Sequence, residues 1–182
     1  MSALSFNKSE PAAVRHRAMM ALRAAMILAL ATAAVPAHST ELQFLGNMSG
    51  QWSGSGKAYL KNLGNVSASC DMKADGAESE MSLTGKCGVL FFSIGLGLQL
   101  KNEGENQFTG LYTGSRTGPA KLEGVLEGNR LEMDITWNGE VNGDRDAKMV
   151  LERTGADSFT QTVTDMVRGE EKTTSQFVFL RM

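Results

Sequence analysis

The feature that most constrains the fold is a two-residue alternation of apolar and polar side chains, which recurs in short runs. In one run, Val66, Ala68, Cys70 and Met72 alternate with serine, aspartate and lysine. Successive side chains of a strand point to opposite faces, so each run predicts a strand with one buried and one wetted face, as in antiparallel sheets. The clearest runs cover 66–73, 80–87, 120–127 and 131–137.

Turn residues separate these runs at intervals of mostly about 8 to 14 residues, which suits consecutive hairpins rather than alternating strands and helices. The best helical candidate is one short turn around Glu41 to Gly46. We therefore predict about ten strands. The predicted turns are Asp75-Gly76, Gly104, Gly118-Pro119, Gly128-Asn129, Asn138-Gly139, Asn142-Gly143, Gly155 and Arg168-Gly169.

Short strands linked by hairpins can close on themselves, which removes exposed sheet edges. The predicted fold is all-β, an antiparallel up-and-down β-barrel of about 8–10 strands. An outer-membrane barrel is disfavoured, because its outer face must be apolar and one face here repeatedly carries Glu, Lys, Asp and Ser. The run 90–100 is apolar on one face and small or neutral on the other. We expect that strand to be covered on both sides.

The N-terminus has the pattern of a secretory signal. Arg15, Arg17 and Arg23 precede an apolar stretch from Ala24 to Val35, followed by Pro36-Ala37. The stretch is shorter than the roughly 20 residues of a membrane-spanning helix. We expect a signal peptide at 1–37, with translation starting at Met1, Met19 or Met20, and a single β-barrel domain at 38–182.

Export fixes the expected compartment and surface charge. We predict a periplasmic protein, with full secretion as the alternative, and no membrane-spanning segment after cleavage. Loss of residues 1–37 removes four basic residues and one acidic residue, which leaves 14 basic against 19 acidic residues and a formal charge of −5. Such a surface gives no attraction to a phosphate backbone, so nucleic acid is not an expected partner.

Two residues near the ends of the predicted domain point to a barrel family. Gly50-Gln51-Trp52 precedes Gly54 and Gly56, and Arg181 ends the last apolar run. This resembles the Gly-x-Trp start of calycin barrels, the superfamily of lipocalins, fatty-acid-binding proteins and avidins. The resemblance implies that Arg181 packs over Trp52 and closes one end of a calycin-like barrel. Both residues would then be structural.

Two further resemblances are local. The string 52–56 is similar to the start of nitrobindin-like haem barrels, which bind iron through a histidine on a late strand. The chain has no histidine after His38, so we expect no haem and no other cofactor. Ser49 to Trp52, Cys70 to Met72 and Leu83 to Cys87 resemble the first half of small periplasmic inhibitors of serralysin-type metalloproteases, whose N-terminal segment plugs the protease cleft.

Cys70 and Cys87 are expected to form a disulfide, because an exported chain with two cysteines usually pairs them. A tight hairpin at Asp75-Gly76 would pair Cys70 with Met81 instead. Two arrangements remain open: the strands are offset by a bulge or a long loop, or Cys87 folds back past the end of its strand. Two buried free thiols are the remaining alternative.

No group of residues predicts catalysis or a metal site. The absence of histidine after position 38 removes Ser–His and Cys–His nucleophilic pairs and histidine metal sites. Asp144 and Asp146 are read as a solvated turn rather than a cation loop, and Asp165 and Arg168 as surface or salt-bridge residues. We expect no catalytic residue, and the binding residues stay unassigned.

The leading functional hypothesis is a non-enzymatic binding protein with a small hydrophobic ligand in the barrel interior. The small inward residues Gly54, Gly56, Ala58 and Ala68 would leave room for it, unless larger side chains fill that space. The second hypothesis is a protease inhibitor or a protein-binding envelope factor, and an uncharacterised enzyme is the third. An ordered segment 38–48 beneath the barrel would favour the first, and a protruding arm the second.

Overall fold

The computed structural model describes residues 43–89 and 91–182. The expected signal peptide at 1–37 and its cleavage site lie outside these residues. A short helix at 43–46 precedes ten strands, in keeping with the predicted helical turn and strand number. The strands are β1 (Gly50–Leu60), β2 (Gly64–Gly76), β3 (Glu80–Val89), β4 (Phe92–Gly104), β5 (Gln107–Thr113), β6 (Ala120–Glu127), β7 (Arg130–Val141), β8 (Asp144–Gly155), β9 (Ser158–Val167) and β10 (Glu170–Arg181).

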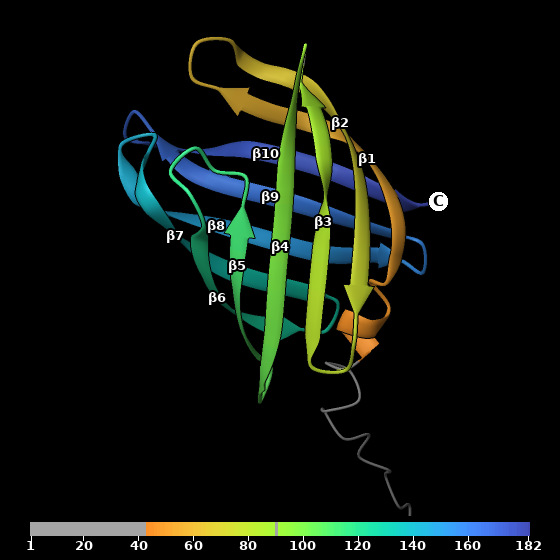
Figure 1. The fold of residues 1–182 in the computed structure, drawn as a ribbon. Coiled ribbons are helices and arrows are strands. Elements are labelled where there is room, and N and C mark those ends of the chain that lie inside the picture. Colours follow the sequence, from red (N-terminus) through yellow and green to blue (C-terminus); the bar gives the residue numbers. More distant parts are fainter. Residues whose placement is uncertain (1–42, 90) are drawn as a thin grey trace, which may run out of the picture. The chain divides into compact units, whose positions relative to one another are not determined.

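The ten strands form a closed antiparallel up-and-down barrel (Figure 1). Each strand pairs with the next along the chain, and β10 closes the barrel by pairing with β1, from Trp52 opposite Arg181 to Ala58 opposite Ser175. The predicted fold class is therefore confirmed. Each of the ten strands therefore pairs with two neighbours, and no strand lies wholly at a sheet edge.

The barrel has two ends that differ in their turns. We call the end that holds the short helix and Arg181 the closed end, and the opposite end the open end. The turns at the open end include 61–63, Phe91, 114–119, 142–143 and 168–169. The turns at the closed end lie at 77–79, 105–106, 128–129 and 156–157.

Two of the predicted turns are wrong. Asp75-Gly76 lies within β2, where Gly76 pairs with Met81, and Asn138-Gly139 lies within β7. The β2–β3 turn is formed by 77–79, where the amide of Ala77 donates to the carbonyl of Glu80 at 2.7 Å. Asn142-Gly143 and Arg168-Gly169 are turns as predicted, and both residues of each pair have positive φ. Asparagine and glycine tolerate that conformation and so favour tight hairpins.

The core fills the barrel with the inward face of every strand. Its largest fully buried side chains include Trp52, Phe108 and Phe159. The expectation that 90–100 is covered on both sides is wrong for the described residues of that run. The outward residues Ser93, Gly95 and Gln99 of β4 are exposed, because no other described segment packs over them; Gly97 is the buried exception.

Candidate functional site at the open end of the barrel

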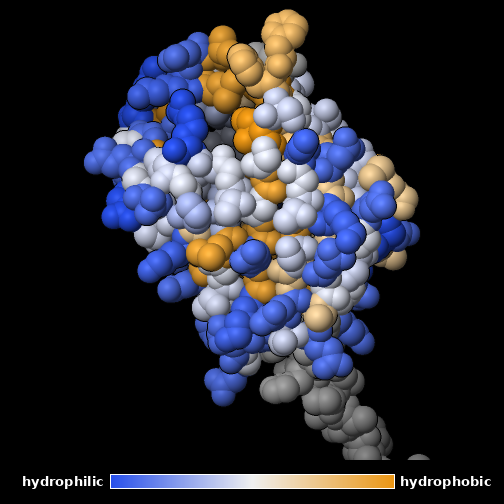
Figure 2. All heavy atoms as spheres, in the orientation of Figure 1, coloured by the Kyte–Doolittle hydropathy of each residue, from blue (hydrophilic) through white to orange (hydrophobic). Residues whose placement is uncertain are grey.

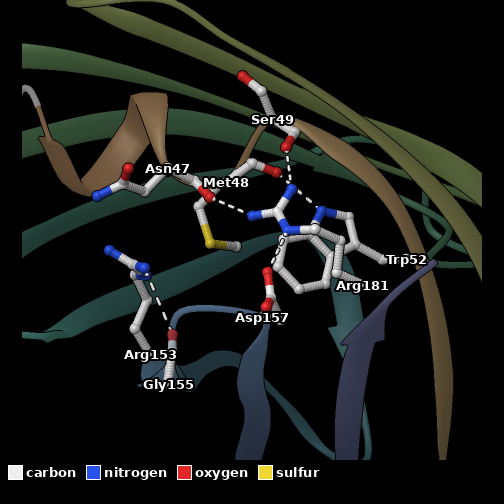
Figure 3. A network of polar contacts seen from close by, with 8 residues as sticks. All are labelled: Asn47, Met48, Ser49, Trp52, Arg153, Gly155, Asp157 and Arg181. Carbon is white, nitrogen blue, oxygen red and sulfur yellow. Dashed lines mark hydrogen bonds and ion pairs between the residues drawn. The ribbon is translucent and has the colours of Figure 1, made fainter.

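The closed end is sealed by Trp52 and Arg181. The guanidinium carbon of Arg181 lies 4.3 Å from the centroid of the Trp52 ring, and the Trp52 side chain is 1% exposed. Arg181 also donates from Nη2 to the carbonyl of Asn47 at 2.8 Å, from Nη1 to the carbonyl of Ser49, and from Nε to Asp157 Oδ1 at 2.9 Å (Figure 3). One side chain thus joins the first strand, the last strand and a turn.

The segment before β1 is part of the same seal. Phe44, Leu45 and Met48 are buried in the core cluster, and Trp52 Nε1 donates to the carbonyl of Met48 at 2.8 Å. Ser49 binds the end of β2, because its hydroxyl donates to the carbonyl of Gly76 and accepts from the amide of Gly76. Residues 43–49 therefore cover the closed end as an ordered plug.

Cys70 and Cys87 form a disulfide across β2 and β3. They lie directly opposite each other in the strand register, and both are buried. The two arrangements expected from a turn at Asp75-Gly76 are both wrong. With the turn centred three residues later, the two cysteines face each other without a bulge or a fold-back.

In the closed half of the barrel, the interior space next to the small residues of β1 is filled by aromatic side chains of β10. A β-carbon at Gly54 would meet the ring of Phe179, and one at Gly56 would meet Phe177 and the backbone of β10. The Phe179 ring stacks on that of Phe159, with centroids 4.6 Å apart. Gly54 and Gly56 therefore leave room for aromatic rings of the chain itself, and this half of the interior is a packed core.

The open end differs, because the barrel wall is incomplete between β4 and β5. Pairing of these strands begins at Gly97 opposite Thr113, so residues 92–96 of β4 extend beyond β5. Phe92 and Ile94 lie on the inward face of β4, opposite Val89 and Cys87. They are nevertheless 73% and 41% exposed. Inward apolar side chains are therefore open to solvent at this gap.

A ring of half-buried apolar side chains continues this surface into the barrel. These side chains belong to five strands, and each packs against the buried core. The phenol ring of Tyr112 meets the indole of Trp137 edge-on at a centroid distance of 6.1 Å, and burial raises the pKa of Tyr112. The half-buried residues are Leu60, Val66, Leu96, Tyr112 and Val141.

Asp165 is a carboxyl group buried at the same end. It is 3% exposed, and its Oδ2 accepts from Asn142 Nδ2 at 3.0 Å. Burial raises the pKa of Asp165 above its usual value; the hydrogen bond from Asn142 opposes this and the carboxylate of Asp144 adds to it. Asp165 Oδ1 and Trp137 Nε1 have no hydrogen bond of good geometry within the described residues, although the nearby indole slightly lowers the pKa of Asp165.

The interpretation of Asp165 as a surface or salt-bridge residue is therefore wrong. Its place in the sequence carried the signal, because Asp165 alternates in phase with the buried Val163 and Val167. An ionisable residue in step with an apolar face is expected to point inward. Arg168, for which we made the same prediction, is exposed and lies in the β9–β10 turn.

Two grooves elsewhere on the barrel are weaker candidates for a functional site. A groove of about 410 Å³ lies along β7–β10, and its lining includes Asp144, Asp146 and the buried Asp165. Another, of about 610 Å³, lies outside β2–β5. Both are lined mainly by outward side chains. Within 43–89 and 91–182, no three histidine, cysteine or acidic residues are grouped so that they could hold a metal ion. In the same residues, no helix is long and apolar enough to cross a membrane.

Comparisons with known proteins inform the fold. No protein-family model matches the chain, and no curated protein matches its sequence. Among solved structures, the barrel is similar to one described as the crystal structure of Rv2717c from M. tuberculosis, with a TM-score of 0.56. The match covers 78% of this chain and 97% of that chain at 12% sequence identity. At this identity the likeness supports the closed β-barrel fold, of which calycins are one type, and nothing finer.

Proposed function

We propose that this chain is an exported, non-enzymatic binding protein that holds a small hydrophobic ligand in the open half of its barrel. The observation that carries the proposal is the exposure of Phe92 and Ile94, which are 73% and 41% exposed although both lie on the inward face of β4. Small-molecule sites are lined mainly by apolar side chains, and the mouth of a β-barrel is a common place for them. The Cys70–Cys87 disulfide is compatible with export.

The difference between the two halves of the barrel supports the same proposal. The closed half is filled by Phe159, Phe177 and Phe179, and sealed by Trp52 and Arg181. The half-buried apolar ring lies at the other end, next to the gap in the wall. A ligand would therefore enter from the open end, because the other end is packed and sealed.

The experiment is a titration of the purified protein with a fluorescent long-chain fatty-acid analogue. Ile94→Glu places a charge on the inward face at the gap, and we expect it to weaken binding at least about tenfold, since a charge in an apolar site is strongly disfavoured. Leu111→Glu is the matched control. Leu111 lies on the outward face of the neighbouring strand and is 43% exposed, against 41% for Ile94.

We expect Leu111→Glu to bind the probe within about twofold of the unmodified protein, because its side chain does not face the interior. Absence of saturable binding to the unmodified protein would contradict the proposal. So would an equal loss of binding in both variants.

A protease inhibitor remains the second candidate. In the inhibitors that the sequence resembles, the segment before the barrel enters the protease. In this chain residues 43–49 are bound to the closed end through Phe44, Leu45, Met48 and Ser49. This arrangement favours the ligand-binding proposal over an inhibitor that acts through that segment.

A further inference from the structure

Three apolar side chains project from the open end, and we call them the apolar tip: Leu63, Phe91 and Phe92. They are 62%, 99% and 73% exposed. Leu63 lies in the β1–β2 turn, and Phe91 and Phe92 lie where β3 turns into β4. Figure 2 shows apolar side chains gathered where this β3–β4 hairpin ends. A group of exposed large apolar residues marks an interaction site more often than a single exposed residue does.

The charged residues nearest the apolar tip along the chain are basic, and the first acidic residue on these strands is Asp71, which lies opposite Lys86 in the pairing of β2 and β3. Residues 43–70 and 84–100 contain no aspartate or glutamate, and their only charged residues are Lys57, Lys61 and Lys86. All three lysines are exposed. Within the part of the chain that the structure describes, none of them forms an ion pair. Acidic residues of the open end, such as Asp144 and Glu170, lie at the starts of β8 and β10.

We propose that the apolar tip docks the protein on an anionic lipid bilayer. Leu63 and the two phenylalanines enter the interfacial region of the bilayer, while the lysines lie against the headgroups. Aromatic and aliphatic side chains combined with unpaired cations are the composition that binds such a surface. In this orientation the gap between β4 and β5 faces the bilayer.

The shape and charge of the tip favour a bilayer over a protein partner. A stable protein–protein interface needs about 1,200–2,000 Å² of buried surface, whereas an exposed aromatic side chain supplies about 150–250 Å². Three side chains on two turns are too few for such an interface. A second copy of this chain is disfavoured in addition, because the lysines around the two tips would repel each other.

The test is binding of the purified protein to vesicles, measured by sedimentation. We expect binding to vesicles of phosphatidylglycerol and phosphatidylcholine, and at least about tenfold weaker binding to phosphatidylcholine alone, since each lysine near an anionic surface adds to the attraction. The double variant Leu63→Ser/Phe91→Ser should lose at least about tenfold in binding. All proteins compared carry the same residues 1–42, so a difference between them reports on the barrel.

A matched control is available at the other end of the barrel. Val178 and Leu180 lie on the outward face of β10 and are 46% and 58% exposed. The double variant Val178→Ser/Leu180→Ser removes a similar apolar surface and should bind the anionic vesicles like the unmodified protein. A Phe91→Trp variant should be quenched by brominated lipid more strongly than the unmodified protein, which shows that the tip itself is inserted.

Equal vesicle binding by the two double variants would overturn the proposal, and so would binding that ignores lipid charge. A tip-dependent dimer in light scattering, with no vesicle binding, would assign the surface to a second copy instead. The vesicle experiment can fail without affecting the ligand proposal, which is tested with the Ile94→Glu variant. Leu63→Ser/Phe91→Ser should bind the fatty-acid analogue normally in the absence of vesicles.

Discussion

The guanidinium of Arg181 lies 4.3 Å from the centroid of the Trp52 ring, and the two residues face each other in the pairing of the first and last strands. The contact predicted from the two ends of the sequence is therefore present. The hydrogen bonds that Arg181 donates to Asn47, Ser49 and Asp157 show why arginine is suited to this position. A planar cation can stack on the indole and still donate to several acceptors at its edge.

Loss of this seal should destabilise the barrel. Trp52→Ala should lower the free energy of unfolding by about 3–5 kcal/mol, the usual cost of removing a large aromatic side chain from a core. Arg181→Met should cost at least about 2 kcal/mol, because two backbone carbonyls lose their donor and the indole loses its cation. Urea unfolding followed by circular dichroism measures both.

Arg153→Met is the control for the arginine substitution. Arg153 lies at the same end, where its Nη2 makes a 3.4 Å hydrogen bond to the carbonyl of Gly155 (Figure 3). Because that contact is exposed, the change should cost less than about 1 kcal/mol. Equal effects of the two methionine variants would show that Arg181 does not seal the barrel.

The disulfide should contribute measurably to stability. Cys70 and Cys87 are 17 residues apart in sequence. Closing a loop of that length stabilises by about 3 kcal/mol in the chain-entropy model. The variant Cys70→Ala/Cys87→Ala should lose about this much, and reductant should destabilise the unmodified protein without affecting the variant. A reductant effect on the variant, or none on the unmodified protein, would contradict this assignment.

The glycines of β1 should differ sharply from a glycine that faces open space. Gly54→Ala should cost about 1–3 kcal/mol, because a β-carbon there would meet the ring of Phe179. At Gly88 the nearest atom to an added β-carbon is Ser69 Oγ at 3.8 Å, an ordinary contact. Gly88→Ala should therefore be neutral or stabilise by up to about 1 kcal/mol. Thermal denaturation of the two variants distinguishes these outcomes, and a stable Gly54→Ala would mean that the closed half is not tightly packed.

The sequence predicted the fold class and the two residues of the seal, because alternation and end motifs are local signals. It misplaced the β2–β3 turn, since Asp75-Gly76 has the composition of a turn although both residues lie in a strand. The error of three residues concealed that Cys70 and Cys87 are directly opposite. Register depends on where the chain reverses, and a two-residue motif does not fix that when a longer loop follows it.

The candidate site was harder to predict, because it depends on where neighbouring strands end. Phe92 and Ile94 read as core residues by their alternation with Ser93. They are exposed because β5 ends at Thr113 and leaves 92–96 without a partner on that side. The length of one strand relative to another is a tertiary property. Asp165, in contrast, could have been found from its phase with Val163 and Val167.

The pH dependence of stability should report the burial of Asp165. Burial raises the pKa of this carboxyl in the folded state above the usual 3.8. As pH rises above that value, the carboxyl ionises in the unfolded chain before it ionises in the folded one, so unfolding releases a proton. Asp165 therefore destabilises the folded protein least below pH 3.8. Its destabilising effect grows as the pH rises and levels off once the pH passes the folded-state pKa.

Asp165→Asn should remove this dependence while keeping an oxygen that can accept from Asn142. The unmodified protein should lose stability relative to Asp165→Asn as pH rises from about 3.5 towards about 7, measured by urea unfolding at a series of pH values. Asp146→Asn is the control, because Asp146 is exposed on the outward face of the neighbouring strand, and it should follow the unmodified protein. If the unmodified protein instead gained stability relative to Asp165→Asn over this range, the carboxylate would be the favoured form in the folded barrel, and a cation or hydrogen-bond donors, rather than burial, would control it.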